Sequence, residues 1–166
     1  QKELKKYLIY KTLFLGKKLL NKEKLSPIEK IVNFICEKLV RKKIRGQFGG
    51  NLQAFVSGGG ALDQNIGMFL NAAGLPTLQG YGLTEASPVV SCNLPDLVKV
   101  ETAGPPFRTN KVKIAEDGEI LIKGENVMLG YWNLKEETEK VIKDGWLHTG
   151  DIGELDNNNY LKITDR

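Results

Sequence analysis

Apolar residues recur every three or four positions through the first part of the chain, with lysines between them. This spacing predicts two amphipathic helices within residues 1–50. The second helix begins at Ser26-Pro27-Ile28-Glu29, a capping box with proline at the first helical position. We expect the apolar stripe of this helix to pack in a core. The cations near its C-terminal end should interact favourably with the helix dipole. The stripe consists of Ile28, Ile31, Val32, Ile35 and Leu39, and the cations are Arg41, Lys42, Lys43 and Arg45.

The pattern changes at residue 51 to short apolar runs separated by glycines. Residues 52–57 are expected to form a buried strand, Ser57-Gly58-Gly59-Gly60 a tight loop, and residues 63–73 a helix with Asp63 as its N-cap. A second short strand follows from Pro76 and ends at Gly80-Tyr81-Gly82. A strand, a helix and a strand in this order form a βαβ unit with parallel strands. Both loops that follow the strands should then lie at the carboxyl edge of one sheet, where α/β sheets bind ligands.

Beyond residue 100 the chain is predicted to be rich in β-strands. Short runs separated by turn signals, Asp117-Gly118 and residues 156–159, favour strands at 112–115, 119–123, 152–155 and 160–164, and a short polar helix is expected at 133–143. The predicted fold class is therefore α/β, with a mixed or parallel sheet followed by a small, barrel-like β subdomain. We divide the chain into a basic helical flank at 1–50, a βαβ region at 51–99 and a β-rich subdomain at 100–166.

Composition limits the classes of protein that this chain can represent. It has 166 residues, of which 41% are hydrophobic, which is enough for a core and excludes wholesale disorder. No apolar run reaches the roughly 18 residues of a membrane-spanning helix. Cys36 and Cys92 stand alone, which excludes a disulfide framework and a cysteine-based zinc site, and a cytoplasmic location is expected.

The formal net charge of +4 hides a strong asymmetry along the chain. Residues 1–50 carry 14 Lys and Arg against 4 Asp and Glu, so their net charge is +10, whereas residues 51–166 carry −6. A basic segment can contact nucleic acid or anionic membrane. We expect no nucleic-acid binding, because no nucleic-acid motif or interleaved aromatic platform accompanies the cations. Peripheral contact with an anionic membrane stays open.

Tyr81-Gly82-Leu83-Thr84-Glu85 places an aromatic ring, a hydroxyl and a carboxylate at the end of a predicted strand. A flat base can stack on Tyr81, Thr84 can donate to a phosphate oxygen, and Glu85 can hold Mg²⁺ alongside substrate phosphates. The alternative is an ordinary loop with Tyr81 half-buried. The glycine run at 57–60 is less specific, because glycines serve a tight turn as readily as a ligand.

A third cluster runs from Asp144 to Asp151 and contains Trp146 and the chain's single histidine, His148. Asp151 follows a glycine and can bind both hydroxyls of a ribose, as acidic residues do in dinucleotide folds. It can equally cap a turn. We expect Trp146 to pack in a core and His148 to be a hydrogen-bonded structural residue.

Together these motifs resemble those of the adenylate-forming acyl-CoA synthetases, most closely the long-chain fatty acid–CoA ligase branch. The resemblance is strongest from residue 51 to the end of the chain. The matching motifs, in order, are Ser57-Gly58-Gly59-Gly60-Ala61-Leu62, Tyr81-Gly82-Leu83-Thr84-Glu85, residues 118–124, Gly130-Tyr131-Trp132, residues 144–151 and Asp165-Arg166.

The resemblance implies a role for each matching residue. The loop formed by Gly58, Gly59, Gly60 and Ala61 would lie along the adenine and the acyl tunnel, and Gly82 would belong to the nucleotide-binding motif. Tyr81 would stack on the adenine, Asp151 would bind the ribose, and Arg166 would lie near the ribose and phosphate. Thr84 would contact the α-phosphate, and Glu85 would be the Mg²⁺ ligand; these two are the expected catalytic residues.

The resemblance also implies a reaction in which a fatty acid is activated with ATP to acyl-AMP and then transferred to CoA. The family's phosphate loop and catalytic lysine have no counterpart in this chain, so it is expected to be an internal part of the large N-terminal domain of a longer enzyme and to have no ligase activity alone. Acyl carrier protein as acceptor, or release of acyl-AMP itself, are alternatives with which the glycine-rich loop is compatible. A basic membrane- or nucleic-acid-binding module is the non-enzyme alternative.

Overall fold

A computed structural model describes residues 2–166 and divides the chain into two compact units. The first unit comprises Gln1–Val56 and Leu62–Leu78, and the second comprises Ser57–Ala61 and Gln79–Arg166. No helix among the described residues is both long and apolar enough to cross a membrane.

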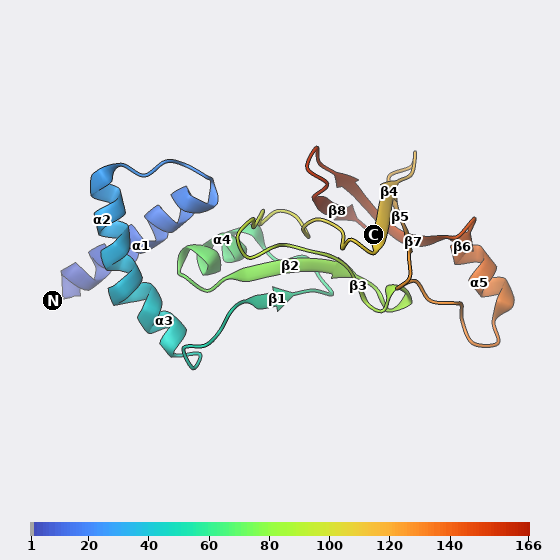
Figure 1. Cartoon of the computed structure of the whole chain (residues 1–166), viewed down its shortest axis with the longest axis horizontal. Helices are drawn as coiled ribbons and strands as arrows, with labels where there is room; N and C mark the ends of the chain where they lie inside the picture. The colour runs from blue at the N-terminus through green and yellow to red at the C-terminus, as the bar shows by residue number, and fades with distance from the viewer. Residues whose placement is uncertain (1) are drawn as a thin grey trace. The chain divides into compact units, whose positions relative to one another are not determined.

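The first unit is mainly helical, and two of its helices begin where the capping residues predict. Both hydrogen bonds of the Ser26–Glu29 capping box are present, and the Asp63 side chain accepts from the backbone N–H of Ile66. These local signals are reliable because a cap needs only residues within one turn. The helices are α1 (Lys2–Leu20), α2 (Pro27–Cys36), the π-helical segment η1 (Glu37–Arg41), α3 (Lys42–Gly46) and α4 (Gln64–Ala72) (Figure 1).

Arg41 is buried, although the sequence pattern predicted a cation at a helix end. Its side chain donates to the carbonyl oxygens of Thr12 in α1 and Ala72 in α4, over 2.9 and 3.1 Å, and to Asn33 Oδ1 over 2.8 Å. Helices α1 and α4 approach so closely at Gly16 that an added Cβ would lie 2.5 Å from the Ala72 oxygen. Arg41 therefore ties three helices together by satisfying carbonyl groups where they meet.

The apolar stripe of α2 does not pack in a core of the first unit, so that prediction is wrong for the described residues. Ile28 and Ile31 are 75% and 64% exposed, whereas Cys36 is fully buried on the face that meets α1. The π-helical segment that follows contains a bond from Lys42 N to Glu37 O. Such a bond spans one residue more than an α-helical bond and shifts the phase of later side chains, which is why the sequence periodicity did not place Arg41 inside.

A three-stranded sheet has the order β1-β2-β3, with β1 (Phe55–Ser57) parallel to β2 (Thr77–Gly82) as the βαβ pattern predicts. The third strand, β3 (Val89–Cys92), was not predicted and runs antiparallel to β2. Its register shifts at Tyr81 and Gly82. A Cβ on Gly82 would lie 1.8 Å from the Pro88 oxygen, so this position requires glycine for close packing.

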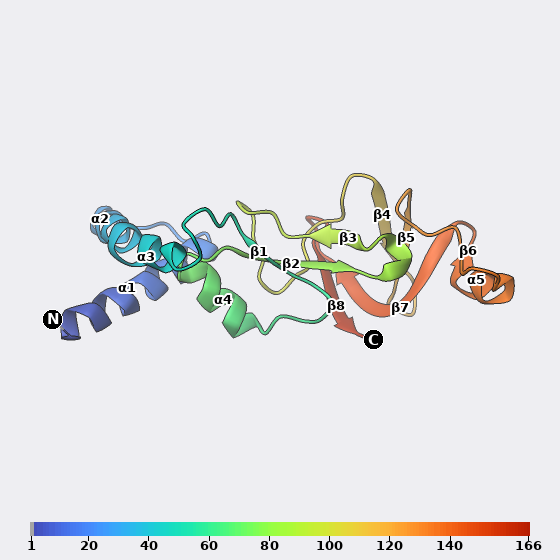
Figure 2. The same cartoon turned by 90° about the horizontal axis from the view of Figure 1, so that it is seen from below.

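The second unit also contains a five-stranded antiparallel sheet, in the order β4-β5-β7-β6, with β8 pairing β7. The sheet does not close, which corrects the barrel-like expectation: β7 is long and curved and pairs with β5, β6 and β8 along different stretches (Figure 2). Its core contains Ile120, Ile122, Leu147 and Leu161. The strands are β4 (Asn110–Ile114), β5 (Glu119–Gly124), β6 (Ile142–Lys143), β7 (Trp146–Leu155) and β8 (Leu161–Asp165); two short helices are η2 (Thr84–Ala86) and α5 (Lys135–Val141).

Candidate functional site

Tyr81, Asp151 and Arg166 lie together in the second unit, although they are far apart in the sequence. The Tyr81 hydroxyl donates to Asp151 Oδ2 over 2.7 Å across a separation of 70 residues. Arg166 Nε lies 3.3 Å from Asp151 Oδ1, although the arginine side chain is largely exposed. Asp151 itself is buried, with 7% of its surface exposed. Three residues that the sequence assigned to nucleoside binding therefore form one polar cluster.

An irregularity in β7 presents Asp151 to this cluster. Glu119 pairs with Ile152 and Leu121 with His148, so two residue steps along β5 face four along β7. Bulges of this kind re-aim side chains next to functional sites. The extra residues of β7 include Asp151. The bulge therefore explains how the Asp151 side chain, which comes from β7, reaches Tyr81 at the end of β2 in the other sheet.

Glu119 and Thr149 hold the bulge in place. Glu119 accepts from the backbone N–H of Gly150 over 2.8 Å and lies 2.7 Å from His148 Nδ1. Thr149 donates to the Ile120 oxygen over 2.7 Å and accepts from the backbone N–H of Asp151 over 3.1 Å. His148 is thus hydrogen-bonded within the fold, as expected, and the bonds fix the backbone on both sides of Asp151.

The electrostatics of the cluster keep Tyr81 as a donor. Burial, and then the hydrogen bond to Asp151, raise the pKa of Tyr81 above its ordinary value, so its hydroxyl stays protonated at neutral pH. An ionised carboxylate has about four lone-pair positions. Asp151 can therefore keep its bond to Tyr81 and still accept from the hydroxyls of a bound sugar.

Thr84 and Glu85 lie in η2, directly after β2. Thr84 is exposed, and Glu85 is half-buried. Glu85 Oε1 accepts from the Tyr131 hydroxyl over 2.8 Å, and the Glu85 backbone oxygen accepts from Met128 N over 2.8 Å. The hydrogen bond that Tyr131 donates to Glu85 raises the pKa of Tyr131, so the tyrosine is a neutral donor.

Glu85 could contribute one ligand to a Mg²⁺ ion that a nucleotide carries. Within residues 2–166 no group of three or more His, Cys, Asp or Glu side chains could hold a metal ion. Mg²⁺ commonly uses one or two carboxylates and completes its coordination with phosphates and water. Glu85 is a single carboxylate with a neutral partner, and it can meet that requirement.

The glycine loop lies beside the end of β2, because a Cβ on Gly58 would be 3.7 Å from the Gly80 oxygen. Gly59 has a φ of +77°, which favours glycine, whereas Gly60 has open space around it. Ala61 is exposed. The loop is thus next to the strand that carries Tyr81, and its open face leaves room for a ligand at Gly60.

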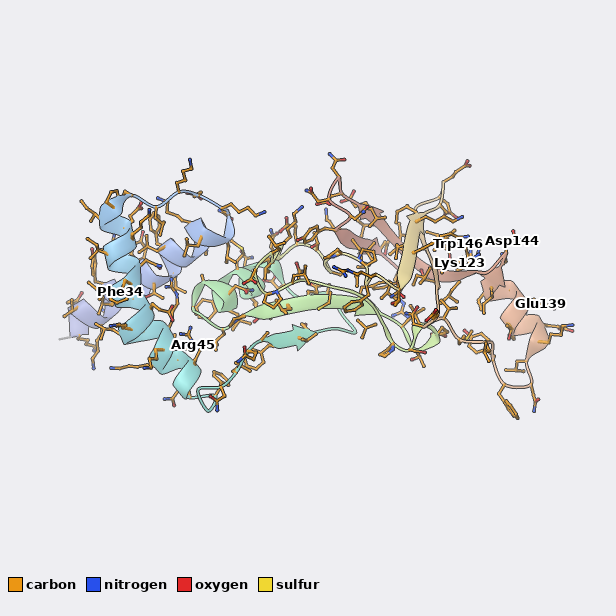
Figure 3. All side chains as sticks on the ribbon, viewed as in Figure 1. Phe34, Arg45, Lys123, Glu139, Asp144 and Trp146 are labelled. Carbon is orange, nitrogen blue, oxygen red and sulfur yellow. The ribbon has the colours of Figure 1, made fainter. Side chains whose placement is uncertain are left out.

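The structure adds residues that the sequence did not single out and revises one. Tyr131 and Glu119 stood within recognised motifs but had no assigned role, because their partners are distant in sequence. Trp146 is half-buried rather than a core residue: Lys113 and Lys123 lie over its ring, 4.2 and 5.9 Å from the centroid, and Lys123 also reaches the Asp144 oxygen (Figure 3).

The α/β fold of this chain matches the N-terminal domain of adenylate-forming enzymes of known structure. Residues 17–132 match the model of the AMP-binding enzyme family. The chain belongs to this family.

Its relatives include long-chain fatty acid–CoA ligases. The chain is 41% identical over 132 residues to long-chain-fatty-acid–CoA ligase FadD15 of Mycobacterium bovis, which covers 80% of this chain and 22% of the relative. This chain therefore spans less than a quarter of the length of that enzyme.

Two solved structures show how widely the fold is used. O-succinylbenzoate coenzyme A synthetase of Bacillus subtilis, in complex with ATP and magnesium, is 34% identical with a TM-score of 0.61, covering 67% of this chain and 26% of that one. Amide bond synthetase McbA of Marinactinospora thermotolerans is 29% identical with a TM-score of 0.63, covering 69% and 26%.

Proposed function

We propose that the complete gene product activates a long-chain fatty acid with ATP and transfers the acyl group to CoA. In the first step a carboxylate oxygen of the fatty acid attacks the α-phosphorus of ATP, and pyrophosphate leaves. In the second step the CoA thiolate attacks the acyl carbonyl carbon of acyl-AMP, and AMP leaves. The observation that carries the proposal is the Tyr81–Asp151 hydrogen bond, which joins two motifs of the family in one site.

The second unit supplies the nucleotide contacts in this proposal. Tyr81 stacks on the adenine, Asp151 accepts from the ribose hydroxyls, and Arg166 adds positive charge near the ribose and phosphate. The loop of Gly58, Gly59, Gly60 and Ala61 borders the adenine and the acyl chain, and Gly82 lets β2 approach Pro88 so that the motif can form.

Thr84 and Glu85 act where charge develops in the first step. Negative charge builds on the phosphate oxygens as the carboxylate attacks, and positioned donors and cations stabilise it. Thr84 is exposed and can donate to an α-phosphate oxygen. Glu85 holds Mg²⁺, which when bound neutralises charge on the phosphates.

The proposal is tested by the products of the complete gene product with palmitate, ATP and CoA. We expect palmitoyl-CoA, AMP and pyrophosphate in equal amounts by mass spectrometry, and their loss in Glu85→Ala. Formation of ADP and phosphate, or undiminished palmitoyl-CoA formation by Glu85→Ala, would contradict the proposed reaction.

An acceptor other than CoA is the second candidate. The similarity to an amide bond synthetase supports it, because the same fold there serves a different transfer. Offering acyl carrier protein and CoA separately to the complete gene product distinguishes the acceptors: acyl carrier protein as the preferred substrate, or accumulation of free acyl-AMP with both, would replace CoA in the proposal.

We also propose a cytoplasmic location with peripheral contact to anionic membrane. Its support is the +10 charge of residues 1–50 and the exposure of Leu4, Tyr7 and Tyr10 on α1, each more than half exposed. Fatty acids partition into bilayers, so membrane contact would place the enzyme near its substrate. Sedimentation with anionic liposomes should decrease as salt rises, and binding that ignores both salt and lipid charge would contradict this proposal.

A further inference from the structure

The segment between β5 and α5 forms three hydrogen bonds to the turn that carries Glu85. Met128 N donates to the Glu85 oxygen over 2.8 Å, and Asn126 Nδ2 donates to the Ala86 oxygen over 2.8 Å. The Tyr131 hydroxyl completes the set with its 2.8 Å bond to Glu85 Oε1. The first two bonds fix the backbone, and Tyr131 alone among the three acts on the carboxylate.

Helix α5 holds Tyr131 in position for this bond. Thr138 accepts from the backbone N–H of Tyr131 over 2.9 Å and donates to the Leu134 oxygen over 3.0 Å. Gly130, with a φ of +151°, lies so close to α5 that an added Cβ would be 2.7 Å from Thr138 Cγ2. The backbone of Tyr131 is therefore fixed against α5, and its side chain extends from there to Glu85.

The chemistry of this partner suits a cation ligand. A lysine or arginine beside Glu85 would orient the carboxylate but also compensate its charge, which would weaken its attraction for Mg²⁺. No salt bridge within residues 2–166 involves Glu85. The Tyr131 hydroxyl orients one oxygen as a neutral donor and leaves the full negative charge for a cation.

We propose that Tyr131 is a positioning residue whose hydroxyl holds the Glu85 carboxylate in the orientation that meets nucleotide-bound Mg²⁺. The inference rests on the proposed function, since it assumes that Glu85 is the Mg²⁺ ligand. Metal sites are sensitive to the groups that orient their ligands: loss of such a partner commonly lowers metal affinity or activity by about 10- to 100-fold.

The test is the affinity of the complete gene product for ATP, measured by calorimetry without fatty acid, with saturating Mg²⁺ and again with EDTA. Tyr131→Phe removes only the hydroxyl. We expect it to weaken ATP binding about tenfold with Mg²⁺ and to leave binding in EDTA unchanged. If the Tyr131 hydroxyl had only a structural role, Tyr131→Phe would change the ATP affinity equally with Mg²⁺ and with EDTA, or would change neither. Either result would overturn the inference.

Tyr160→Phe is the matched control. The Tyr160 hydroxyl donates to the Leu97 backbone oxygen over 2.9 Å, so its removal deletes a tyrosine hydrogen bond in the same unit without touching a carboxylate. We expect Tyr160→Phe to bind ATP like the wild type under both conditions. An equal, Mg²⁺-dependent loss in Tyr160→Phe would show that the effect is not specific to Glu85.

Glu85→Gln separates this inference from the proposed function. If Tyr131 acts through Glu85, Tyr131→Phe has no further effect in the Glu85→Gln background. A Mg²⁺-dependent loss of ATP affinity in Glu85→Gln but not in Tyr131→Phe would reject the positioning role of Tyr131 and leave the proposed role of Glu85 intact. No loss in Glu85→Gln, or no ATP binding by the wild type, would reject the proposed role of Glu85 and this inference with it.

Discussion

Replacing Arg41 by methionine should destabilise the helical unit, because the guanidinium satisfies buried groups of three helices. It donates to the carbonyl oxygens of Thr12 and Ala72, both in residues only 1% exposed. A buried acceptor that loses its donor costs about 1–3 kcal/mol. Ala72 ends α4, so its carbonyl has no helical donor, whereas Thr12 lies within α1 and keeps one. The lost partner of Ala72 and the lost bonds to Thr12 and Asn33 give roughly 2–4 kcal/mol, and methionine offsets part of this by keeping an apolar stem and removing the desolvation penalty of a buried charge. We expect a net loss of about 2 kcal/mol.

Urea unfolding of the chain, followed by circular dichroism at helical wavelengths, measures this loss, because most of the helical residues lie in α1 to α4. With a typical slope of about 2 kcal/mol per molar urea, the midpoint should fall by roughly 1 M. Lys42→Met is the matched control, since the adjacent Lys42 is exposed, and its effect should stay within about 0.5 kcal/mol. If Arg41→Met unfolds at the same urea concentration as Lys42→Met, Arg41 does not hold the helices together.

Two further predictions concern the capping box and the bulge. Hydrogen bonds from Lys18, and then from the Ser26 backbone, lower the pKa of Glu29 from 4.5 to about 2; its contribution to stability is therefore complete above pH 4.5 and lost as the pH falls towards 2. Glu29→Gln should unfold at lower temperature than the wild type at pH 7 and at the same temperature near pH 2, and a constant difference would contradict this linkage. Glu119→Gln weakens the bonds to Gly150 and His148 and should lower the AMP affinity of the complete gene product by about three- to tenfold. The control Glu116→Gln, at an exposed position, should leave the AMP affinity unchanged. Equal affinities for the two variants would show that Glu119 does not position Asp151.

Local signals in the sequence predicted the parts of the fold that depend on neighbouring residues. The Ser26–Glu29 box and the Asp63 cap are complete within one helical turn, and the βαβ order fixed the parallel pairing of β1 and β2. The strand β3 and the inward position of Arg41 were missed, because each depends on a partner that the sequence does not place. The exposure of the α2 stripe was missed as well, because periodicity marks an apolar helix face and does not show what covers it.

The site was predictable as a set of motifs but not as a geometry. Tyr81, Asp151 and Arg166 could be proposed separately, whereas their association depends on how β7 bulges beside β5. The residues that orient the site are harder to find from sequence. Tyr131 and Glu119 resemble ordinary members of a loop and a strand until the structure shows which atoms their side chains reach.

The central claim is that Asp151, held between Tyr81 and Arg166, binds the nucleoside, and calorimetric titration of AMP into the complete gene product tests it most directly. Asp151→Asn keeps the shape of the side chain but removes its charge, and Glu154→Gln makes the same change at an exposed position of β7. We predict that the wild type and Glu154→Gln bind AMP equally and that Asp151→Asn binds at least about tenfold more weakly, since hydrogen bonds to a charged group contribute about 1.5–3 kcal/mol. AMP binding by Asp151→Asn as tight as that of Glu154→Gln would contradict the account.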